Sequence, residues 1–339
     1  MTMRISLEEA ATRLKNGEVV AIPTETVYGL AADATNDLAL QQIFRLKQRP
    51  ADHPLIVHIG DISQVQYWAA AFPEMAVTLA QAFWPGAFTL VLPALDHVSR
   101  VVRGGESTVA LRVPNHPVAL ELLNLSGLSV AAPSANLFTQ LSPTTADHVE
   151  AGLGEAIPVL DGGACHVGIE STIVNVFVDA QNEAQWQLLR PGMVSEADIE
   201  RVAGKPQYAA SVSTDKTLAA TPVPKVPGQH ALHYSPRTPL QLFKDKASLL
   251  QASSALMQQN VKCAALLIGE AEAGIQADFS QMDFPRIELP NQPDLVAERL
   301  YGALHSLDAL KVDCLLVELP PNRPEWLAVQ DRLSRAGHQ

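Results

Sequence analysis

The first 205 residues alternate between short strand-like segments and helix-like segments, and this order constrains the fold more than any other feature of the chain. Turn residues separate β-branched and aliphatic runs from stretches with helical spacing. Such interleaving predicts an α/β layer fold. The predicted strands span Glu18–Ile22, Leu55–Ile59, Phe88–Leu92, Thr108–Val113, Ser129–Ala132, Thr172–Val176 and Gln185–Leu189. The predicted helices span Leu7–Lys15, Asp37–Leu46, Glu74–Phe83, Pro117–Leu125, Ala146–Gly152 and Glu196–Ala203.

The composition changes after Gly204, where a stretch rich in Pro, Ala, Ser and Thr begins. Its centre, PVPKVPG, is too broken by proline for a core element and stiff enough for a linker. The 339 residues exceed the usual span of one hydrophobic core, which favours two domains. We therefore predict a first domain over 1–205, a linker over 206–238 and a smaller domain over 239–339.

The smaller domain repeats the alternating pattern and is predicted to be a Rossmann-like α/β domain with a parallel sheet. Its predicted strands are Leu240–Phe243, Cys263–Ile268 and Cys314–Glu318. Its predicted helices are Lys246–Gln259, Asp294–Leu310 and Pro324–Arg335. The sequence of this part contains no pattern of residues that predicts a catalytic site.

The charge distribution argues against a large nucleic-acid surface. The chain has a net charge of −12, and residues 1–205 hold 12 Lys and Arg against 22 Asp and Glu. Residues 113–189 contain no Lys or Arg. An RNA backbone requires several cations along one face, whereas a small anion requires only a few that converge. Lys47, Arg49, Arg112 and Arg190 suffice for a small anion if the fold brings them together.

Two pairs of polar residues, Lys47 with Arg49 and Ser134 with Asn136, could serve one phosphorylated ligand. Pro50 biases Arg49 away from helical geometry, and in an extended segment positions two apart point to the same side. A planar guanidinium fork and a point-charge ammonium suit a polyphosphate. On the spacing alone, a solvated helix end is the simpler explanation of Lys47 and Arg49.

The two pairs stand within a longer series of motifs, PTETVYGL, KQRPADHPLIVH, WPGAFTLVL, TVALRVP, PSAN, ESTI and RPG. This series resembles the YrdC-type threonylcarbamoyl-AMP synthases in their long two-domain form, in the same order, and the resemblance continues into HYSP of the linker. The Lys-x-Arg and Ser-x-Asn pairs are the signature of that family. The resemblance implies a twisted mixed sheet with an open concave pocket, and the synthesis of threonylcarbamoyl-adenylate and pyrophosphate from L-threonine, bicarbonate or CO2, and ATP.

The resemblance also implies roles for individual residues. Lys47 and Arg49 would hold the phosphates and act with Ser134 and Asn136 in catalysis. The further residues implied for ATP are His53, Thr108, Ser142, Arg190 and Tyr234. Those implied for threonine are Thr26, His58, Ala132, Ser171 and Arg112, the last as a fork on the carboxylate. Without the resemblance, ordinary turn or strand hydroxyls explain Thr26, Thr108 and Ser171.

The implied reaction requires orientation of the reactants and exclusion of water, because a carbamate and a mixed anhydride are both labile in water. Mg²⁺ would accompany ATP and stabilise charge on its phosphates. We expect no metal site made by the protein alone and, since no activated Ser or Cys is evident, no covalent enzyme intermediate.

The linker is expected to take part in excluding water. In the two-domain members a HYAP-type tetrapeptide lies over the pocket, and here it reads His233-Tyr234-Ser235-Pro236. We expect Tyr234 to reach the ATP site and the linker to act as a lid. A tyrosine that only pins the linker to the domain surface is the alternative.

Motifs and segments that the sequence lacks limit the classes of enzyme and the cellular location that we expect. The sequence has no P-loop, no nucleophile elbow and no HExxH zinc motif. Three well-separated cysteines fit a reducing cytoplasm, and no segment predicts a signal peptide or a membrane span. We expect a cytoplasmic protein that hands its product to a tRNA threonylcarbamoyl transferase. Two alternatives stay open: an RNA-binding module of the same fold, and a carbamoyl transferase of the hydrogenase-maturation type.

Overall fold

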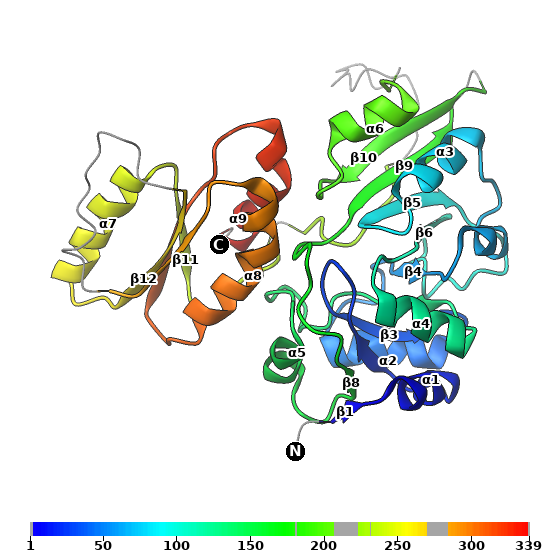
Figure 1. Ribbon diagram of the computed structural model, residues 1–339, viewed down its shortest axis with the longest axis horizontal. Coiled ribbons are helices and arrows are strands. Elements are labelled where there is room, and N and C mark those ends of the chain that lie inside the picture. The colour runs from blue at the N-terminus through cyan, green and yellow to red at the C-terminus, as the bar shows by residue number, and fades with distance from the viewer. Residues whose placement is uncertain (1–2, 180–181, 207–222, 231, 270–283, 338–339) are drawn as a thin grey trace.

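Two units, each built around its own sheet, make up the described part of the chain (Figure 1). The structure, a computed structural model, describes residues 3–179, 182–206, 223–230, 232–269 and 284–337. The predicted linker over 206–238 therefore lies partly outside the described residues. Described linker residues 223–230 and 232–238 run between the larger, N-terminal unit and the smaller, C-terminal unit.

The larger unit is a mixed sheet whose described strands follow the order β1-β8-β2-β3-β7-β4-β6-β5-β9-β10. β4 pairs with β6 and β5 with β9 in parallel, whereas β5 with β6 and β9 with β10 are antiparallel. The strands are β1 (Arg4–Ile5), β2 (Val20–Ile22), β3 (Gly29–Asp33), β4 (Ile56–His58), β5 (Phe88–Pro93), β6 (Thr108–Arg112), β7 (Val130–Ala131), β8 (Val159–Leu160), β9 (Thr172–Val178) and β10 (Ala184–Arg190). The helices are α1 (Leu7–Lys15), α2 (Asp37–Lys47), α3 (Glu74–Phe83), α4 (Pro117–Ser126), α5 (Ala146–Leu153) and α6 (Glu196–Ala203), with a 3₁₀ helix η1 (Ile62–Tyr67).

Both faces of this sheet are covered, which follows from the alternation of side chains along each strand. In β2, Ala21 packs into the main core, whereas Val20 and Ile22 pack into a second core on the other face. Leu30 and Ala31 of β3 divide in the same way. The strand ends, rather than the strand faces, are therefore the places where polar side chains can gather.

Helix α2 places the Lys-x-Arg pair. Asn36 accepts hydrogen bonds from the backbone N–H groups of Leu38 and Ala39 and so begins the helix. Gln48 adopts the left-handed conformation, with φ 52° and ψ 38°, and ends it. Lys47 is thus the last helical residue, and Arg49 lies beyond the turn.

The smaller unit is a sheet of order β11-β14-β12-β13. Its strands are parallel, as the sequence predicts, but β13 was not predicted. In Figure 1, α7 lies on one face of this sheet, and α8 and α9 lie on the face toward the larger unit. The strands are β11 (Leu240–Phe243), β12 (Cys263–Ile268), β13 (Arg286–Leu289) and β14 (Cys314–Glu318). The helices are α7 (Lys246–Gln258), α8 (Pro293–Asp308) and α9 (Leu327–Ala336), the last preceded by a 3₁₀ turn, η3 (Pro324–Trp326).

The two units share a hydrophobic core. Val27, Leu141 and Ile169 of the larger unit belong to the same buried cluster as Leu300 and Leu333 of α8 and α9. His148 of α5 also stacks on His305 of α8, with ring centroids 4.0 Å apart. The smaller unit is therefore packed against the larger one, on the side where the linker crosses.

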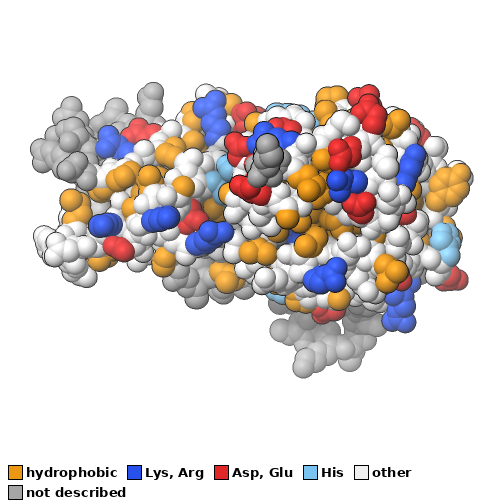
Figure 2. Space-filling view, turned by 90° about the horizontal axis from the view of Figure 1, so that it is seen from below, with side chains coloured by type: hydrophobic (Ala, Val, Ile, Leu, Met, Phe, Trp, Pro, Cys, Tyr) orange, Lys and Arg blue, Asp and Glu red, His pale blue; other side chains and the backbone are white. Residues whose placement is uncertain are grey.

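Hydropathy can be followed along the helices, and charge on one face of the surface. Within the described ranges, no helix is both long and apolar enough to cross a membrane. The uncharged run over 75–95 consists of α3, a turn at Trp84–Gly86 and β5. On the face shown in Figure 2, lysine and arginine side chains are scattered among acidic ones and do not gather into one patch.

Candidate active site

A small cavity, hereafter the active-site cavity, lies where several strand ends and the linker meet. It encloses about 50 Å³. Most of the residues proposed above for ATP or threonine line it, although they come from seven separate motifs. These are Thr26, Arg49, His58, Arg112, Ala132, Ser134, Ser171, Arg190 and Tyr234.

Lys47 lies beside the cavity and joins the two signature pairs. Its Nζ donates to the carbonyl oxygens of Ser134, at 2.5 Å, and Asn136, at 2.6 Å. Burial, and then the adjacent Arg49, lower the pKa of Lys47 well below its ordinary value. The amino group of Lys47 thus holds the PSAN loop in place through two of its carbonyl oxygens.

Arg49 lines the cavity, and one N–H of its guanidinium group makes no hydrogen bond to a described residue. Its Nη2 donates to the carbonyl oxygen of Pro54 at 2.9 Å. Its buried Nε–H has no partner among the described residues. Burial lowers the pKa of Arg49 to about 10, so the group remains charged at neutral pH. This N–H is a donor available to an anion.

Arg190 connects the ESTI motif with the linker. Its Nε and Nη2 donate to the carbonyl oxygen of Ser171 at 3.1 and 2.9 Å, and its Nη1 donates to the carbonyl oxygen of Pro227 at 3.0 Å. Nη2 also lies 3.2 Å from Ser171 Oγ. Arg190 therefore stands at the wall of the cavity with its donors shared between the larger unit and the linker.

The arrangement around Arg112 differs from the expectation that its fork faces only a ligand. Arg112 Nη2 lies 2.7 Å from Glu25 Oε1, and Nη1 donates to Thr26 Oγ1 at 3.0 Å. Burial alone would raise the pKa of Glu25, but Arg112 outweighs it and the pKa lies below its ordinary value. Arg112 is already paired with an acid that the sequence analysis did not single out, although Glu25 lies within PTETVYGL.

His58 is fully enclosed beside this pair. Burial, and then the charge of Arg112, lower its pKa to about 3. Its Nδ1 has no hydrogen-bond partner within the described part of the chain. A neutral imidazole next to a guanidinium group offers a ligand an uncharged polar contact, not a second positive charge.

Four other predicted residues do not line the active-site cavity. Ser142 is buried and donates to Glu170 Oε1 at 2.6 Å. His53 lies at a neighbouring cavity of about 340 Å³ and is 2.8 Å from His230 of the linker. Thr108 begins β6, at the opposite end from Arg112, and pairs there with Pro93. Asn136 holds its own loop through hydrogen bonds to the carbonyl oxygens of Leu137 and Gln140.

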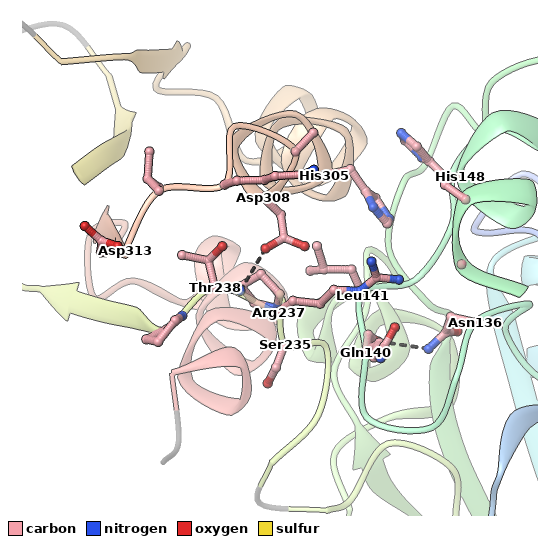
Figure 3. Close-up of a pocket in the computed structure, with 17 residues that line it drawn as sticks. Asn136, Gln140, Leu141, His148, Ser235, Arg237, Thr238, His305, Asp308 and Asp313 are labelled. Atoms are coloured by element: carbon pink, nitrogen blue, oxygen red, sulfur yellow. Dashed lines mark hydrogen bonds between the residues drawn. The ribbon is translucent and has the colours of Figure 1, made fainter. Parts of the chain in front are cut away.

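A larger cavity, of about 610 Å³, lies between the two units (Figure 3). Asn136 and Gln140 lie on one side of it, and His305, Asp308 and Asp313 on the other. Of the predicted site residues, Asn136 alone lines it. We locate the candidate active site at the smaller cavity, because three arginines from separate motifs converge there. The charged residues that line the larger cavity belong to none of the motifs; they are Arg237, Asp308, Lys311 and Asp313.

The linker forms one wall of the active-site cavity. Pro227, Gly228, His233 and Tyr234 all line it. Gly228 has φ +89°, and a Cβ at this position would lie 2.4 Å from the Tyr234 hydroxyl oxygen. The linker thus crosses the cavity closely and makes it smaller than the open pocket that the sequence predicts.

Glu170 is a functional candidate that the sequence analysis missed. It lines the cavity and binds Ser142, Tyr301 and Arg332, the last two from the smaller unit. Burial alone would raise its pKa, but the charges of Arg332 and then Arg190 lower it to about 2. Its place in ESTI was a signal, but its partners Tyr301 and Arg332 lie 131 and 162 positions away in sequence.

No group of three or more His, Cys, Asp or Glu side chains able to hold a metal ion occurs among the described residues. The two carboxylates nearest the cavity, Glu25 and Glu170, are each paired with an arginine. Any Mg²⁺ at this site would therefore enter with the phosphates of a nucleotide.

Comparison with known proteins identifies relatives of both units. A family model for Sua5, YciO and YrdC, described as "Telomere recombination", matches residues 12–192. A model described as "Threonylcarbamoyl-AMP synthase, C-terminal domain" matches residues 194–337. A Bacillus subtilis protein named threonylcarbamoyl-AMP synthase is 41% identical, with 97% of this chain and 92% of the relative covered. A Vibrio vulnificus protein of that name is 37% identical, with 55% of this chain and 98% of the relative covered.

Solved structures give the same result for the whole fold. Pyrococcus abyssi Sua5 complexed with L-threonine superposes with a TM-score of 0.80 at 34% identity, covering 99% of this chain and 96% of that one. A double alanine variant of the same protein gives a TM-score of 0.83. By both family models and by the length over which its relatives align, the chain belongs to the Sua5/YciO/YrdC family, in the form that carries the threonylcarbamoyl-AMP synthase C-terminal domain.

Proposed function

We propose that this chain is an L-threonylcarbamoyladenylate synthase, a nucleotidyltransferase that forms threonylcarbamoyl-AMP and pyrophosphate from L-threonine, bicarbonate or CO2, and ATP. The observation that carries the proposal is the convergence of Arg49, Arg112 and Arg190 on one cavity together with Ser134 and Ser171. Cations from separate motifs suit a ligand with several anionic groups. The names of the full-length relatives and the threonine complex of one of them point to the same reaction.

The cavity has two halves in this proposal. Arg49, Arg190, Ser134 and Tyr234 face the nucleotide, while Lys47 and Asn136 hold the PSAN loop in place behind them. Thr26, His58, Arg112, Ala132 and Ser171 form the threonine half. Ser142 belongs to the nucleotide half through Glu170, and His53 reaches ATP only from the neighbouring cavity. Thr108 does not line the active-site cavity, and its contact with ATP stays a prediction.

The Glu25–Arg112 pair refines the threonine half. A threonine carboxylate that approaches Arg112 meets a guanidinium group whose charge Glu25 already balances. Recognition then depends on hydrogen bonds from Thr26 and His58 as well as on the fork. A threonine methyl group would be distinguished from hydrogen by packing, worth about 1 to 3 kcal/mol.

The chemistry proceeds without a covalent bond to the enzyme. The threonine amine takes up CO2 and loses a proton, which gives a carbamate. A carbamate oxygen then attacks the α-phosphorus of ATP, and the bond to the bridging oxygen of pyrophosphate breaks. Mg²⁺ bound to the phosphates would supply part of the charge stabilisation. Arg49 and Arg190 orient the phosphates and oppose the negative charge that develops during the transfer.

Closure by the linker protects the carbamate and the mixed anhydride from water. Pro227, Gly228, His233 and Tyr234 cover the cavity. Tyr234 is 1% exposed, and its hydroxyl group has no partner in the described chain. We propose that this segment opens for ATP and for product release. The product then passes, in the cytoplasm, to a transferase that modifies tRNA.

The direct test is incubation of the protein with ATP, L-threonine and bicarbonate, with pyrophosphate and threonylcarbamoyl-AMP both measured. Both products are expected in equal amounts, and omission of any one substrate should abolish them. L-serine should give roughly tenfold lower kcat/KM, because one buried methyl group is lost. Pyrophosphate release that does not depend on threonine, or an absence of the adenylate, would contradict the proposal.

A further inference from the structure

Arg332 comes from the final helix, α9, yet its guanidinium group binds Glu170, which lines the active-site cavity. It is fully buried, and its Nε donates to Glu170 Oε2 at 2.8 Å. Its Nη2 lies 3.3 Å from the carbonyl oxygen of Glu170. The smaller unit therefore sends a charged side chain into the ESTI motif of the larger unit.

A second residue of the smaller unit makes the same connection. Tyr301 of α8 is fully buried, and its hydroxyl group donates to Glu170 Oε2 at 3.0 Å. Arg332 also lies over the ring of Tyr234, 5.1 Å from its centroid. Glu170, Tyr301, Arg332 and Tyr234 thus form one buried cluster between the two units and the linker.

Glu170 needs this connection because of where its charge lies. It lines the active-site cavity together with Arg49 and Arg190, the two groups proposed to hold the phosphates of ATP. A buried carboxylate without a partner would attract those arginines and repel the phosphates. The pKa of Glu170 is lowered to about 2 despite burial, so the group carries its charge at neutral pH.

We propose that Arg332 is a positioning residue for the nucleotide half of the site: with Tyr301 it holds and neutralises Glu170, so that the positive charges of Arg49 and Arg190 act on the phosphates of ATP. In this proposal the smaller unit contributes to ATP binding, although none of its residues touches the reacting atoms. This inference rests on the proposed function, and it predicts which charge must be removed to make Arg332 dispensable.

The experiment compares Arg332→Met with the double variant Arg332→Met/Glu170→Gln in the full-length protein. Met keeps much of the length of the side chain against Tyr234 and removes the charge. The affinity for ATP is measured by calorimetry, and KM for ATP and for threonine by pyrophosphate release. We expect Arg332→Met to weaken ATP binding roughly tenfold, because Glu170 then competes for Arg190. The double variant should recover most of this loss, and KM for threonine should change less than twofold.

Two further variants keep the test decisive. Tyr301→Phe removes one donor to Glu170 and no charge, so ATP binding should weaken by roughly two- to threefold in a protein that still folds. Arg299→Met, on the exposed surface of α8, is the matched control and should leave ATP binding unchanged. If Arg332→Met alone fails to fold, the double variant and Tyr301→Phe decide.

The inference is overturned if Arg332→Met binds ATP within twofold of the wild type, or if the double variant binds it as weakly as Arg332→Met. A purely structural role would lower the melting temperature in both variants without this recovery. If the wild type forms no adenylate, the proposed function fails, but the order of ATP affinities among the variants still tests the role of Arg332.

Discussion

Arg49 is the clearest single residue on which to test the candidate site, because its buried Nε–H has no partner among the described residues. Arg49→Met removes this donor and the charge. We expect kcat/KM for ATP to fall by about 100-fold or more, the usual effect of losing one group that stabilises developing charge. Initial rates of pyrophosphate release measure it.

The neighbouring helix supplies the control for that change. Arg45 is an exposed residue of α2, one turn before Arg49 in sequence, and Arg45→Met removes the same charge from the surface. Its kcat/KM should stay within about twofold of the wild type, because surface charges contribute little. Equal losses in the two variants would mean that Arg49 acts through net charge alone.

The sequence predicted the residues of the site better than their partners. Lys47, Arg49, Arg112 and Arg190 were candidates to converge on one anion. The structure brings the three arginines to one cavity and places Lys47 beside it, bound to the carbonyl oxygen of Ser134. Glu25 could have been found, since it lies between two of the threonines of a motif already singled out. The pairing of Glu170 with Arg332 spans 162 positions of the chain, and no local pattern carries such information.

At the scale of elements, the linker segment 227–234 can be tested at one glycine. Gly228→Ala would place a methyl group against the Tyr234 hydroxyl at a position with φ +89°, which disfavours the closed arrangement. We expect more water to reach the product, so that the fraction of turnovers ending as AMP rises several-fold. Parallel assays of AMP and pyrophosphate early in the reaction give this fraction.

Gly105 provides a matched change of backbone strain without a clash. It has φ +84°, and a Cβ there would meet nothing within 4 Å. Gly105→Ala should leave the ratio of AMP to pyrophosphate as in the wild type. An unchanged ratio in Gly228→Ala would show that residues 227–234 do not shield the product.

The helices and strands were predicted where local propensity and burial favour the same structure. Every predicted strand and helix overlaps an observed one, but the short strands β1, β3, β8 and β13 were not predicted. The sequence of β3, GLAAD, contains small residues with low strand propensity. Gly29 is needed there because a Cβ would lie 2.9 Å from Ala132 Cβ. Tertiary packing, not local preference, makes this segment a strand.

At the scale of the whole molecule, the contact between units should respond to pH. Burial, and then His305, lower the pKa of His148 to about 4, and burial lowers that of His305, with Asp147, Asp308 and Arg237 nearby. The unfolded chain binds these protons at higher pH than the folded one, so stability falls as pH drops from about 6.5 toward 4. Between pH 7.5 and pH 5, the free energy of unfolding of His148→Phe should fall by about 2 kcal/mol less than that of the wild type.

Chemical denaturation at the two pH values measures this difference. His166→Phe replaces an exposed histidine outside the stack and is the control. It should follow the wild type at both pH values. If His148→Phe loses stability on acidification as much as the wild type does, the stack of His148 on His305 is not the source of the acid sensitivity.

The size of the active-site cavity has a consequence for how tightly ATP can be held. A volume of about 50 Å³ accommodates a few water molecules and no nucleotide, so under the proposed function ATP can enter only when the linker moves away. Displacing the linker costs free energy, which weakens the observed binding of ATP. The rarer the uncovered form is, the weaker the observed binding becomes. A variant that stays uncovered longer would capture ATP more readily but lose more of its product to hydrolysis. A change in how often the linker uncovers the cavity would therefore shift ATP affinity and product yield in opposite directions.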